Sequence, residues 1–295
     1  MALPTRLLLH QRPVLRALAS AALAGLRPRT GAVPETPGPF TEVELPPRPD
    51  ELVQAYVRHL GGDPSSYRDR VPAHLFPQWS FPLAAQAFAG LPWPLLRVVN
   101  AGCRIEQHAP LPAREPLVVR ARLASVDVDE RRALLVHECW TGTRSSPDAV
   151  RSELRALVPL GKPARGAARE RPRVPESARE IAWLDVRADA GLDFAKLTGD
   201  VNPIHWLAPW ARKSGFRGCI LHGFATLGRA VEAMNRALFA GDPSRLAAVD
   251  VRFTRPLLLP AKVGVYVSAE RGLWVGDAPS GGAYLEGTYE TEKVR

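Results

Sequence analysis

The sequence predicts an α+β fold in which one unit, a buried helix wrapped by a curved antiparallel sheet, occurs twice. Three observations lead to this prediction. A Pro-Leu pair at residues 110–111 returns at residues 256–257, each time about five residues before a strand-like segment. An apolar helical stretch precedes the strands in each half, and a segment rich in Pro, Gly and Arg separates the halves. Because a sheet must cover one face, the helix is expected to lie against it.

The second half shows the pattern most clearly. Strands are predicted at residues 246–254, where apolar and polar residues alternate, and at residues 262–269 and 283–289. A helix is predicted at residues 223–241, because its apolar residues recur at spacings of three and four. Gly-Asp-Pro at residues 241–243 is a typical helix stop.

The first half follows the same order with weaker signals. Strands are predicted at residues 97–107, 116–124 and 133–141. The matching helix is predicted at residues 82–91, shorter than its counterpart and with few polar residues.

These patterns divide the chain into four parts. We expect a basic arm at residues 1–34, a first domain at 35–158, a linker at 159–178 and a second domain at 179–295. The arm has five arginines and no acid, which is typical of an organelle transit peptide or an interfacial helix but equally fits a disordered or loosely docked arm. The expected location is the cytoplasm, or the mitochondrion if the arm is a transit peptide.

Composition excludes several classes of protein. No apolar run reaches the roughly 18 residues that cross a bilayer. The net charge is +9, but the chain has no basic run with interleaved aromatic residues, so nucleic-acid binding is not predicted. A basic surface equally suits a phosphate-bearing ligand or an acidic carrier protein. Three widely spaced cysteines predict neither a disulfide framework nor a zinc site.

The stretch LTGDVNPIHW, residues 197–206, places an acid and a histidine on one stiffened loop. Asp200 and His205 can share one water, which the imidazole deprotonates while the acid orients it or relays a proton. Gly199 permits a tight turn, and Pro203 restrains the backbone. Asn202 is expected to hydrogen-bond the loop backbone or to orient the acid.

A second stretch, GFRGCILHGFATLG at residues 215–228, opens the long second-half helix. The first turn of a helix presents free N–H groups and a partial positive charge, so the N–H of Gly223 is a candidate oxyanion donor. His222 is expected to pack locally at the helix start. Asp200, His205 and His222 could instead bind a metal ion, but no further ligand has suitable spacing, so no metal is predicted.

These two stretches resemble the signature of MaoC-like, or R-specific (type 2), enoyl-CoA hydratases and dehydratases. The resemblance rests on FAKLTGDVNPIH at residues 194–205 and on the later HG helix start. It implies a double hot-dog fold, with Asp200 and His205 activating water and Gly223 binding the thioester oxygen. Gly199, Asn202 and Pro203 also match the motif. Phe224 departs from it, since many relatives have Met there.

The first half resembles the non-catalytic hot dog of double-hot-dog relatives. LGGDPSSYR at residues 60–68 echoes LTGDVNPIH, with Asp63 placed on Asp200 when spacing is kept. Arg68 then falls where the second half has His205, and Ser65 where it has Asn202. We therefore expect no catalysis from this half.

The resulting prediction is a lyase that interconverts a trans-2-enoyl-CoA and a (3R)-3-hydroxyacyl-CoA without a cofactor. Two alternatives remain open. One is a 3-hydroxyacyl-carrier-protein dehydratase of fatty-acid or polyketide synthesis, and the other is a non-catalytic hot-dog partner subunit. The expected partners are an acyl-CoA or acyl-carrier-protein thioester and, as a further option, a second copy of the chain.

Overall fold

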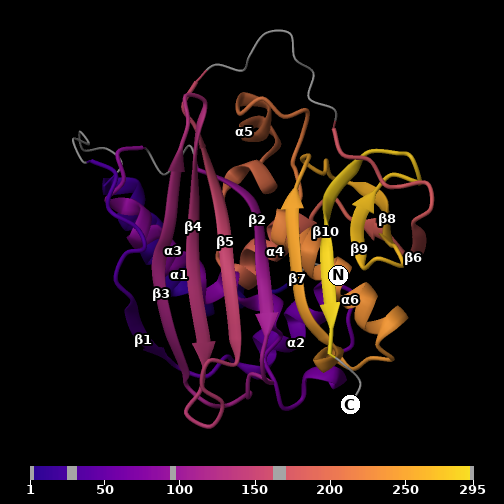
Figure 1. Ribbon diagram of the computed structural model, residues 1–295, viewed down its shortest axis with the longest axis horizontal. Helices are drawn as coiled ribbons and strands as arrows, with labels where there is room; N and C mark the ends of the chain where they lie inside the picture. Colours follow the sequence, from indigo (N-terminus) through magenta and orange to yellow (C-terminus); the bar gives the residue numbers. More distant parts are fainter. Residues whose placement is uncertain (1–2, 25–31, 94–97, 162–170, 293–295) are drawn as a thin grey trace.

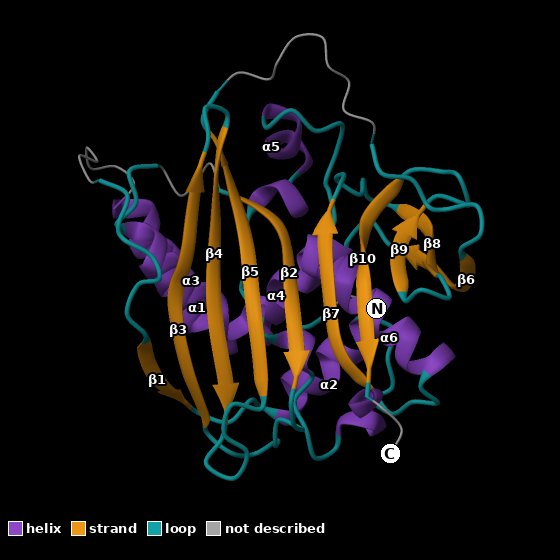
Figure 2. Cartoon of the chain, viewed as in Figure 1, coloured by secondary structure: helices purple, strands orange, loops and turns teal. Residues whose placement is uncertain are grey.

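A single ten-stranded antiparallel sheet runs through the whole protein, with the helices packed behind it (Figures 1 and 2). The computed structural model describes residues 3–24, 32–93, 98–161 and 171–292. The strands are β1 Thr41–Leu45, β2 Val99–Gln107, β3 Leu117–Val128, β4 Arg132–Gly142, β5 Val150–Pro159, β6 Arg179–Val186, β7 Leu246–Phe253, β8 Ala261–Val267, β9 Gly272–Gly276 and β10 Ala283–Thr291.

The strand order shows that the sheet consists of two copies of one unit. The order is β1-β3-β4-β5-β2-β7-β10-β9-β8-β6. Read inward from its own edge, the second set, β6-β8-β9-β10-β7, has the same order as the first, β1-β3-β4-β5-β2. All the pairings are antiparallel. The repeated unit expected from the Pro-Leu pairs is therefore present, and the α+β fold class is confirmed.

The helices divide between the two units in the same way. They are α1 Arg12–Ala24, α2 Asp50–His59, α3 Pro77–Ala89, α4 Ala190–Thr198, α5 Ala208–Lys213 and α6 Gly223–Leu238. Helix α3 packs on β3 and β4 of the first unit, and α6 packs on β6, β7 and β10 of the second. In each unit a shorter helix, α2 or α4, ends just before a loop that leads to this central helix.

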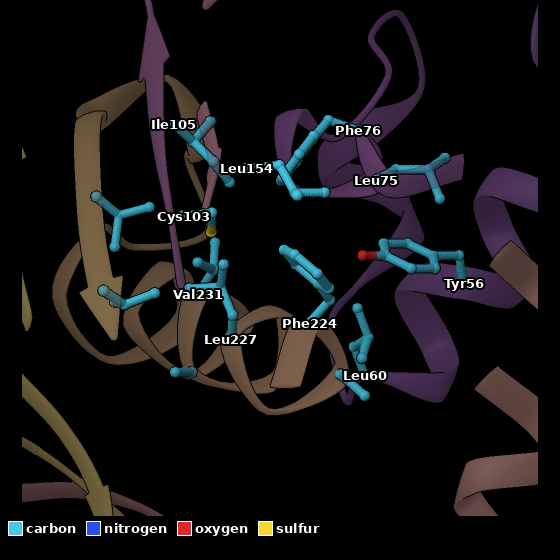
Figure 3. Close-up of a cluster of buried hydrophobic side chains, with 14 of the residues drawn as sticks. Tyr56, Leu60, Leu75, Phe76, Cys103, Ile105, Leu154, Phe224, Leu227 and Val231 are labelled. Carbon is cyan, nitrogen blue, oxygen red and sulfur yellow. The ribbon is translucent and has the colours of Figure 1, made fainter. Parts of the chain in front are cut away.

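The two units share one hydrophobic core as well as one sheet. Figure 3 shows side chains of α6 (Phe224, Leu227 and Val231) pointing toward Cys103 and Ile105 of the first-unit strand β2. All of these side chains are buried. Burial of apolar surface on both sides of the junction therefore stabilises the two units together.

The junction itself is the pairing of β2 with β7, in which Cys103 lies opposite Val251. On its outer face Asp250 of β7 forms ion pairs with Arg155 and Arg104 of the first unit, at 2.5 and 3.7 Å. Two arginines of the first unit are thus paired with an acid of the second on this face of the sheet.

Several elements differ from the predictions. Helix α3 begins at Pro77 and not at residue 82, and Pro82 lies inside it, where it has no N–H to donate to the preceding turn. Strands β1, β5, β6 and β9 and helices α1, α2, α4 and α5 were not predicted. Strand β5 was missed although its burial alternates regularly, because its buried face includes Ser152 and Ala156, which weaken the apolar signal.

The expected linker and arm are only partly described. Within the linker, residues 162–170 lie outside the described residues, whereas Val174 is buried against Tyr266 and Ala283 of the second unit. Of the arm, residues 3–24 form a 3-10 turn (η1, Thr5–Gln11) and α1, and Leu7 and Gln11 are fully buried. This part of the arm is docked and not loose.

We predict that Gly102→Val weakens the junction. A Cβ atom at Gly102 would lie 2.2 Å from the main-chain oxygen of Val251 on the paired strand, and neither backbone can yield without breaking the ladder. Overpacking of this kind typically costs about 1–3 kcal/mol of unfolding free energy, which urea titration measures. Gly90→Ala is the control, because nothing lies within 4 Å of a Cβ there. Equal stability of both variants would contradict the prediction.

Candidate active site

The loop after α4 holds Asp200 through a left-handed turn at its first residue. Gly199 caps α4 with φ +80°, a conformation that glycine adopts without steric cost. Its N–H donates to the carbonyl of Ala195, and the chain then turns toward Asp200. The side chain of Asp200 is 17% exposed, so the carboxylate lies at the edge of the buried region.

His205 ends a short 3-10 turn (η5, Pro203–His205) and is buried. Its Nδ1 lies 2.8 Å from the main-chain oxygen of Ile220. Since a carbonyl oxygen can only accept, Nδ1 bears the proton, and Nε2 keeps a free lone pair. Burial lowers the pKa of His205, an effect that Asp200 and the Ile220 carbonyl partly oppose. The neutral imidazole is thus the form favoured at neutral pH, with Nε2 available as a base.

His222, the residue before α6, contacts both the backbone of Asp200 and the ring of His205. Its Nε2 donates to the main-chain oxygen of Asp200 at 3.0 Å, and its ring stacks on that of His205 with centroids 3.5 Å apart. The pKa of His222 lies well below its ordinary value, first because of burial and then because of His205. A neutral His222 holds the backbone of Asp200 in place, which agrees with the local packing role expected for it.

The start of α6 lies beside this pair of imidazoles. Helix geometry leaves the N–H of Gly223 without a carbonyl partner inside the helix. A Cβ atom on Gly223 would lie 2.6 Å from the ring of Phe253, so glycine is required for Phe253 to pack here. Phe224 contacts Phe253 and also Phe76 and Phe81 of the first unit, which places the helix start at the boundary between the units.

Asn202 and Pro203 shape the loop between the acid and the histidine. The side chain of Asn202 caps the η5 turn by accepting from the N–H of Ile204 at 3.3 Å, and Pro203 occupies the first position of that turn. The N–H of Asn202 in turn donates to Oδ1 of Asp200 at 3.4 Å. Of the two roles expected for Asn202, the structure shows the backbone hydrogen bond.

A metal ion is poorly suited to this site. Asp200, His205 and His222 each offer a ligand atom within 4.8 Å of the others. However, the two rings are stacked with only 22° between their planes. A ligated metal lies close to the plane of each imidazole, at about 2.0–2.1 Å for zinc. Rings that face each other in this way, with centroids 3.5 Å apart, do not direct their in-plane lone pairs at one common position, so they would have to rotate to share an ion.

Three contributors to the site were not predicted from sequence. The carbonyl of Ile220 sets the tautomer of His205, and a main-chain group of this kind has no signal in sequence. Gly191 in α4 allows the loop to approach, since a Cβ there would lie 2.0 Å from the His205 carbonyl oxygen. Gln11 reaches the last turn of α4 from the N-terminal segment. Helix α4 itself was not predicted, so Gly191 gave no signal in the sequence.

This fold and this loop are those of a double hot-dog protein, and comparison with known proteins identifies the domain. Residues 169–277 match the family model described as MaoC like domain. The chain is 29% identical over 263 residues to 3-hydroxyacyl-thioester dehydratase X of Mycobacterium tuberculosis, covering 87% of this chain and 88% of that protein. It is 24% identical over 191 residues to a probable enoyl-CoA hydratase 2 of Dictyostelium discoideum, covering 61% and 64%. The second unit is therefore a MaoC-like domain, and the resemblance noted in the sequence is confirmed.

Solved structures support the same fold. HtdX of Mycobacterium tuberculosis superposes with a TM-score of 0.69 at 22% identity, over 86% of this chain and all (100%) of that one. A conserved hypothetical protein of the same organism, described as having a double hotdog fold, gives a TM-score of 0.54 at 14% identity over 88% and 97% of the two chains. The double hot-dog arrangement is thus confirmed.

The first unit contains a counterpart of the loop in a different register from the one expected. Asp63 precedes a proline and caps a 3-10 turn (η2, Pro64–Tyr67) by accepting from the N–H of Ser65. Asn202 does the same in the second unit, so Asp63 matches Asn202 and not Asp200. The left-handed Gly61, with φ +86°, matches Gly199, and the first-unit loop is one residue shorter, so Gly62 alone stands where the second unit has Asp200 and Val201. Arg68 is exposed and does not replace His205.

A glutamate from the other unit fills the space left by Gly62. A Cβ at Gly62 would lie 2.2 Å from Oε2 of Glu232, a buried residue of α6. Glu232 accepts from the hydroxyl of Tyr67 at 2.8 Å. His74, which precedes α3 as His222 precedes α6, has Nε2 3.2 Å from Glu232 Oε1, although the direction is too oblique for a hydrogen bond. These buried groups join the two units.

We predict that Glu232→Ala destabilises the protein strongly. The substitution removes the carboxylate to which Tyr67 and Asn235 donate, so these two buried donors lose a hydrogen-bond acceptor. Leaving a buried donor without its partner typically costs about 1–3 kcal/mol of unfolding free energy, which urea titration measures. Arg68→Ala is the control, because its exposed side chain should affect neither stability nor turnover. A Glu232→Ala protein as stable as the Arg68→Ala protein would show that the carboxylate is not a structural link.

Proposed function

We propose that the protein interconverts a trans-2-enoyl thioester and a (3R)-3-hydroxyacyl thioester by adding or removing water. The observation that supports this most directly is the state of His205, a buried neutral imidazole. Its Nδ1–H donates to the main-chain oxygen of Ile220, which leaves the lone pair of Nε2 free. The names of the relatives, a dehydratase and a hydratase acting on thioesters or CoA esters, agree with it.

In the direction of hydration, one water lies between Asp200 and His205. Nε2 of His205 takes a proton from the water while the oxygen forms a bond to C3 of the enoyl group. The π electrons of the double bond move to C2 and the thioester oxygen, and C2 then receives a proton from the acid–base pair. Asp200 orients the water and stabilises the imidazolium that forms. Dehydration is the reverse of these steps.

The thioester oxygen becomes negative during this reaction, and we assign its stabilisation to the N–H of Gly223. This donor lies at the positive end of α6 and is fixed before substrate arrives, so it needs no reorganisation. Thioester conjugation supplies the activation, and we assign no metal or redox cofactor to the site.

We propose an acyl-CoA as the substrate, with an acyl-carrier-protein thioester as the alternative; the exposed arginines suit the phosphates of either carrier. Comparison of crotonyl-CoA with the same acyl group on a carrier protein distinguishes them. Formation of a homodimer is a separate prediction, measured by analytical ultracentrifugation.

For location, we propose the cytoplasm over the mitochondrion. No helix within residues 3–24, 32–93, 98–161 and 171–292 has the length and apolar character needed to cross a membrane. The docking of Leu7 and Gln11 favours retention of the N-terminal segment over its removal as a transit peptide.

The direct test is turnover of crotonyl-CoA by the purified protein and by Asp200→Asn and His205→Ala variants. We expect each substitution to lower kcat by about 100-fold or more, the usual effect of losing a general acid or base. The double variant should be no worse than the poorer single variant, because both residues serve one water. Near wild-type hydration by either variant, with circular dichroism showing an intact fold, would refute the mechanism.

The acidic limb of the pH–rate profile provides an independent prediction. Protonated His205 cannot accept a proton from water, so activity falls as the pH drops through its pKa. Since burial lowers that pKa from its ordinary value of 6.5, we expect kcat/KM to be retained at pH 6.5 and lost at lower pH. Measurement of kcat/KM between pH 4.5 and 8 checks this, and a half-maximal point above 6.5 would contradict it.

A further inference from the structure

The N-terminal segment from Leu3 to Val14 is packed along α4, the helix that ends at the catalytic loop. The N–H of Leu3 donates to Asp193 at 3.0 Å, and the ammonium of Lys196 donates to the Leu3 carbonyl at 2.7 Å. Asp193 and Lys196 are almost completely buried, and Leu7 is fully so. The segment is therefore part of the folded second unit, although it begins the chain.

The same segment covers the turn from which Asp200 departs. Gln11 donates from Nε2 to the main-chain oxygen of Leu197 at 2.9 Å. That carbonyl is in the last turn of α4, where helix geometry leaves it without a partner. A Cβ on Gly199 would lie 2.8 Å from Cβ of Val14, so Val14 rests directly on the left-handed turn. Both contacts lie within three residues of Asp200.

Gln11 is in turn held by a buried chain of hydrogen bonds from the first unit. Arg48 donates from Nη1 to Gln78 Oε1 at 2.7 Å, and Gln78 donates from Nε2 to Gln11 Oε1 at 3.1 Å. All three side chains are at least nine-tenths buried. Each amide accepts on one side and donates on the other, so the chain has one direction and ends at the Leu197 carbonyl. Polar groups in such a low-dielectric setting hold each other firmly.

The loop is thus held from two sides. His222 donates to the main-chain oxygen of Asp200, and Gln11 donates to that of Leu197, three residues earlier. Between these two anchors lie only Thr198 and the flexible Gly199. Loss of the Gln11 anchor would leave this side of the loop to the hydrogen bond from Gly199 to Ala195 and to a long one, 3.4 Å, from the N–H of Asp200 to Thr198 Oγ1.

We propose that Gln11 is a positioning residue for Asp200, and that the contacts of Gln11 and Val14 with the end of α4 are a functional part of the active-site structure. This inference rests on the proposed hydratase function for its effect on rate. It assigns to the first unit a second role besides structural support, since its Arg48 and Gln78 set the orientation of Gln11.

The test compares Gln11→Met with Leu9→Ala in the full-length protein. Methionine fills a similar space but cannot donate to Leu197, whereas Leu9 is in the same turn with its side chain 59% exposed. In Gln11→Met we expect kcat for crotonyl-CoA to fall about tenfold while KM changes less than twofold. The acidic limb of the pH–rate profile should also move to lower pH, because a displaced Asp200 raises the pKa of His205 less. Leu9→Ala should match the wild type in both measurements.

Hydrogen–deuterium exchange of the peptide spanning residues 194–206 gives a readout that does not depend on activity. We expect faster exchange in Gln11→Met than in Leu9→Ala. Unchanged exchange, or an unchanged kcat in an active enzyme, would overturn the proposal. If the wild type does not hydrate crotonyl-CoA, the proposed function fails, and exchange alone still decides whether Gln11 holds the loop. If Gln11→Met does not fold, Val14→Ala tests the adjacent contact with Gly199 by the same measurements.

Discussion

The structure depends on the close backbone pairing of β2 with β7. This one ladder joins two five-stranded sheets into a single sheet, and it is possible only because Gly102 allows the Val251 carbonyl to approach. Once the strands are paired, α3 and α6 lie behind the same sheet, and Phe81 of α3 and Phe76 just before α3 contact Phe224 in the first turn of α6. The candidate site begins at that point, one residue before Phe224. A catalytic loop from one unit is thus placed at the boundary of two.

Within the site, main-chain groups determine the state of the side chains. The Ile220 carbonyl selects the tautomer of His205, and the Asp200 carbonyl receives the proton of His222. Burial favours the neutral form of both imidazoles, which differ in what they present: His205 keeps a lone pair on Nε2, while His222 donates to the backbone. The two rings would repel each other as cations, and the nearby His205 lowers the pKa of His222 in addition to burial. His222 thus stays neutral, stacks on His205 and donates to the Asp200 backbone.

The sequence was sufficient where local chemistry decides the structure. The Gly-Asp-x-Asn-Pro-x-His spacing predicted a stiff loop, and the 3.6-residue period predicted α6 to within a turn, because capping residues and periodicity act over a few residues. It was insufficient where distant segments decide. Gln11 is 186 residues from the carbonyl it caps, and Glu232 occupies space left by Gly62 of the other unit. The register of the first-unit loop was predicted wrongly for a related reason: equal spacing placed Asp63 on Asp200, whereas the capping of a proline turn pairs it with Asn202.

The asymmetry between the two units has a physical explanation in this corrected register. An acid next to a histidine is useful for proton transfer only if one of them keeps an unused lone pair and faces a space that water can enter. In the second unit Asp200 is partly exposed and His205 keeps Nε2 free. In the first unit the carboxylate comes from Glu232, which is 3% exposed and already accepts from Tyr67, and Asn235 donates to the same hydroxyl. The same positions therefore hold a closed polar network in one unit and an open acid–base pair in the other. The closed network links α6 to the first unit, and α6 begins at Gly223. The loop of the first unit therefore helps to hold the N–H of Gly223, which we assign as the oxyanion donor of the second unit.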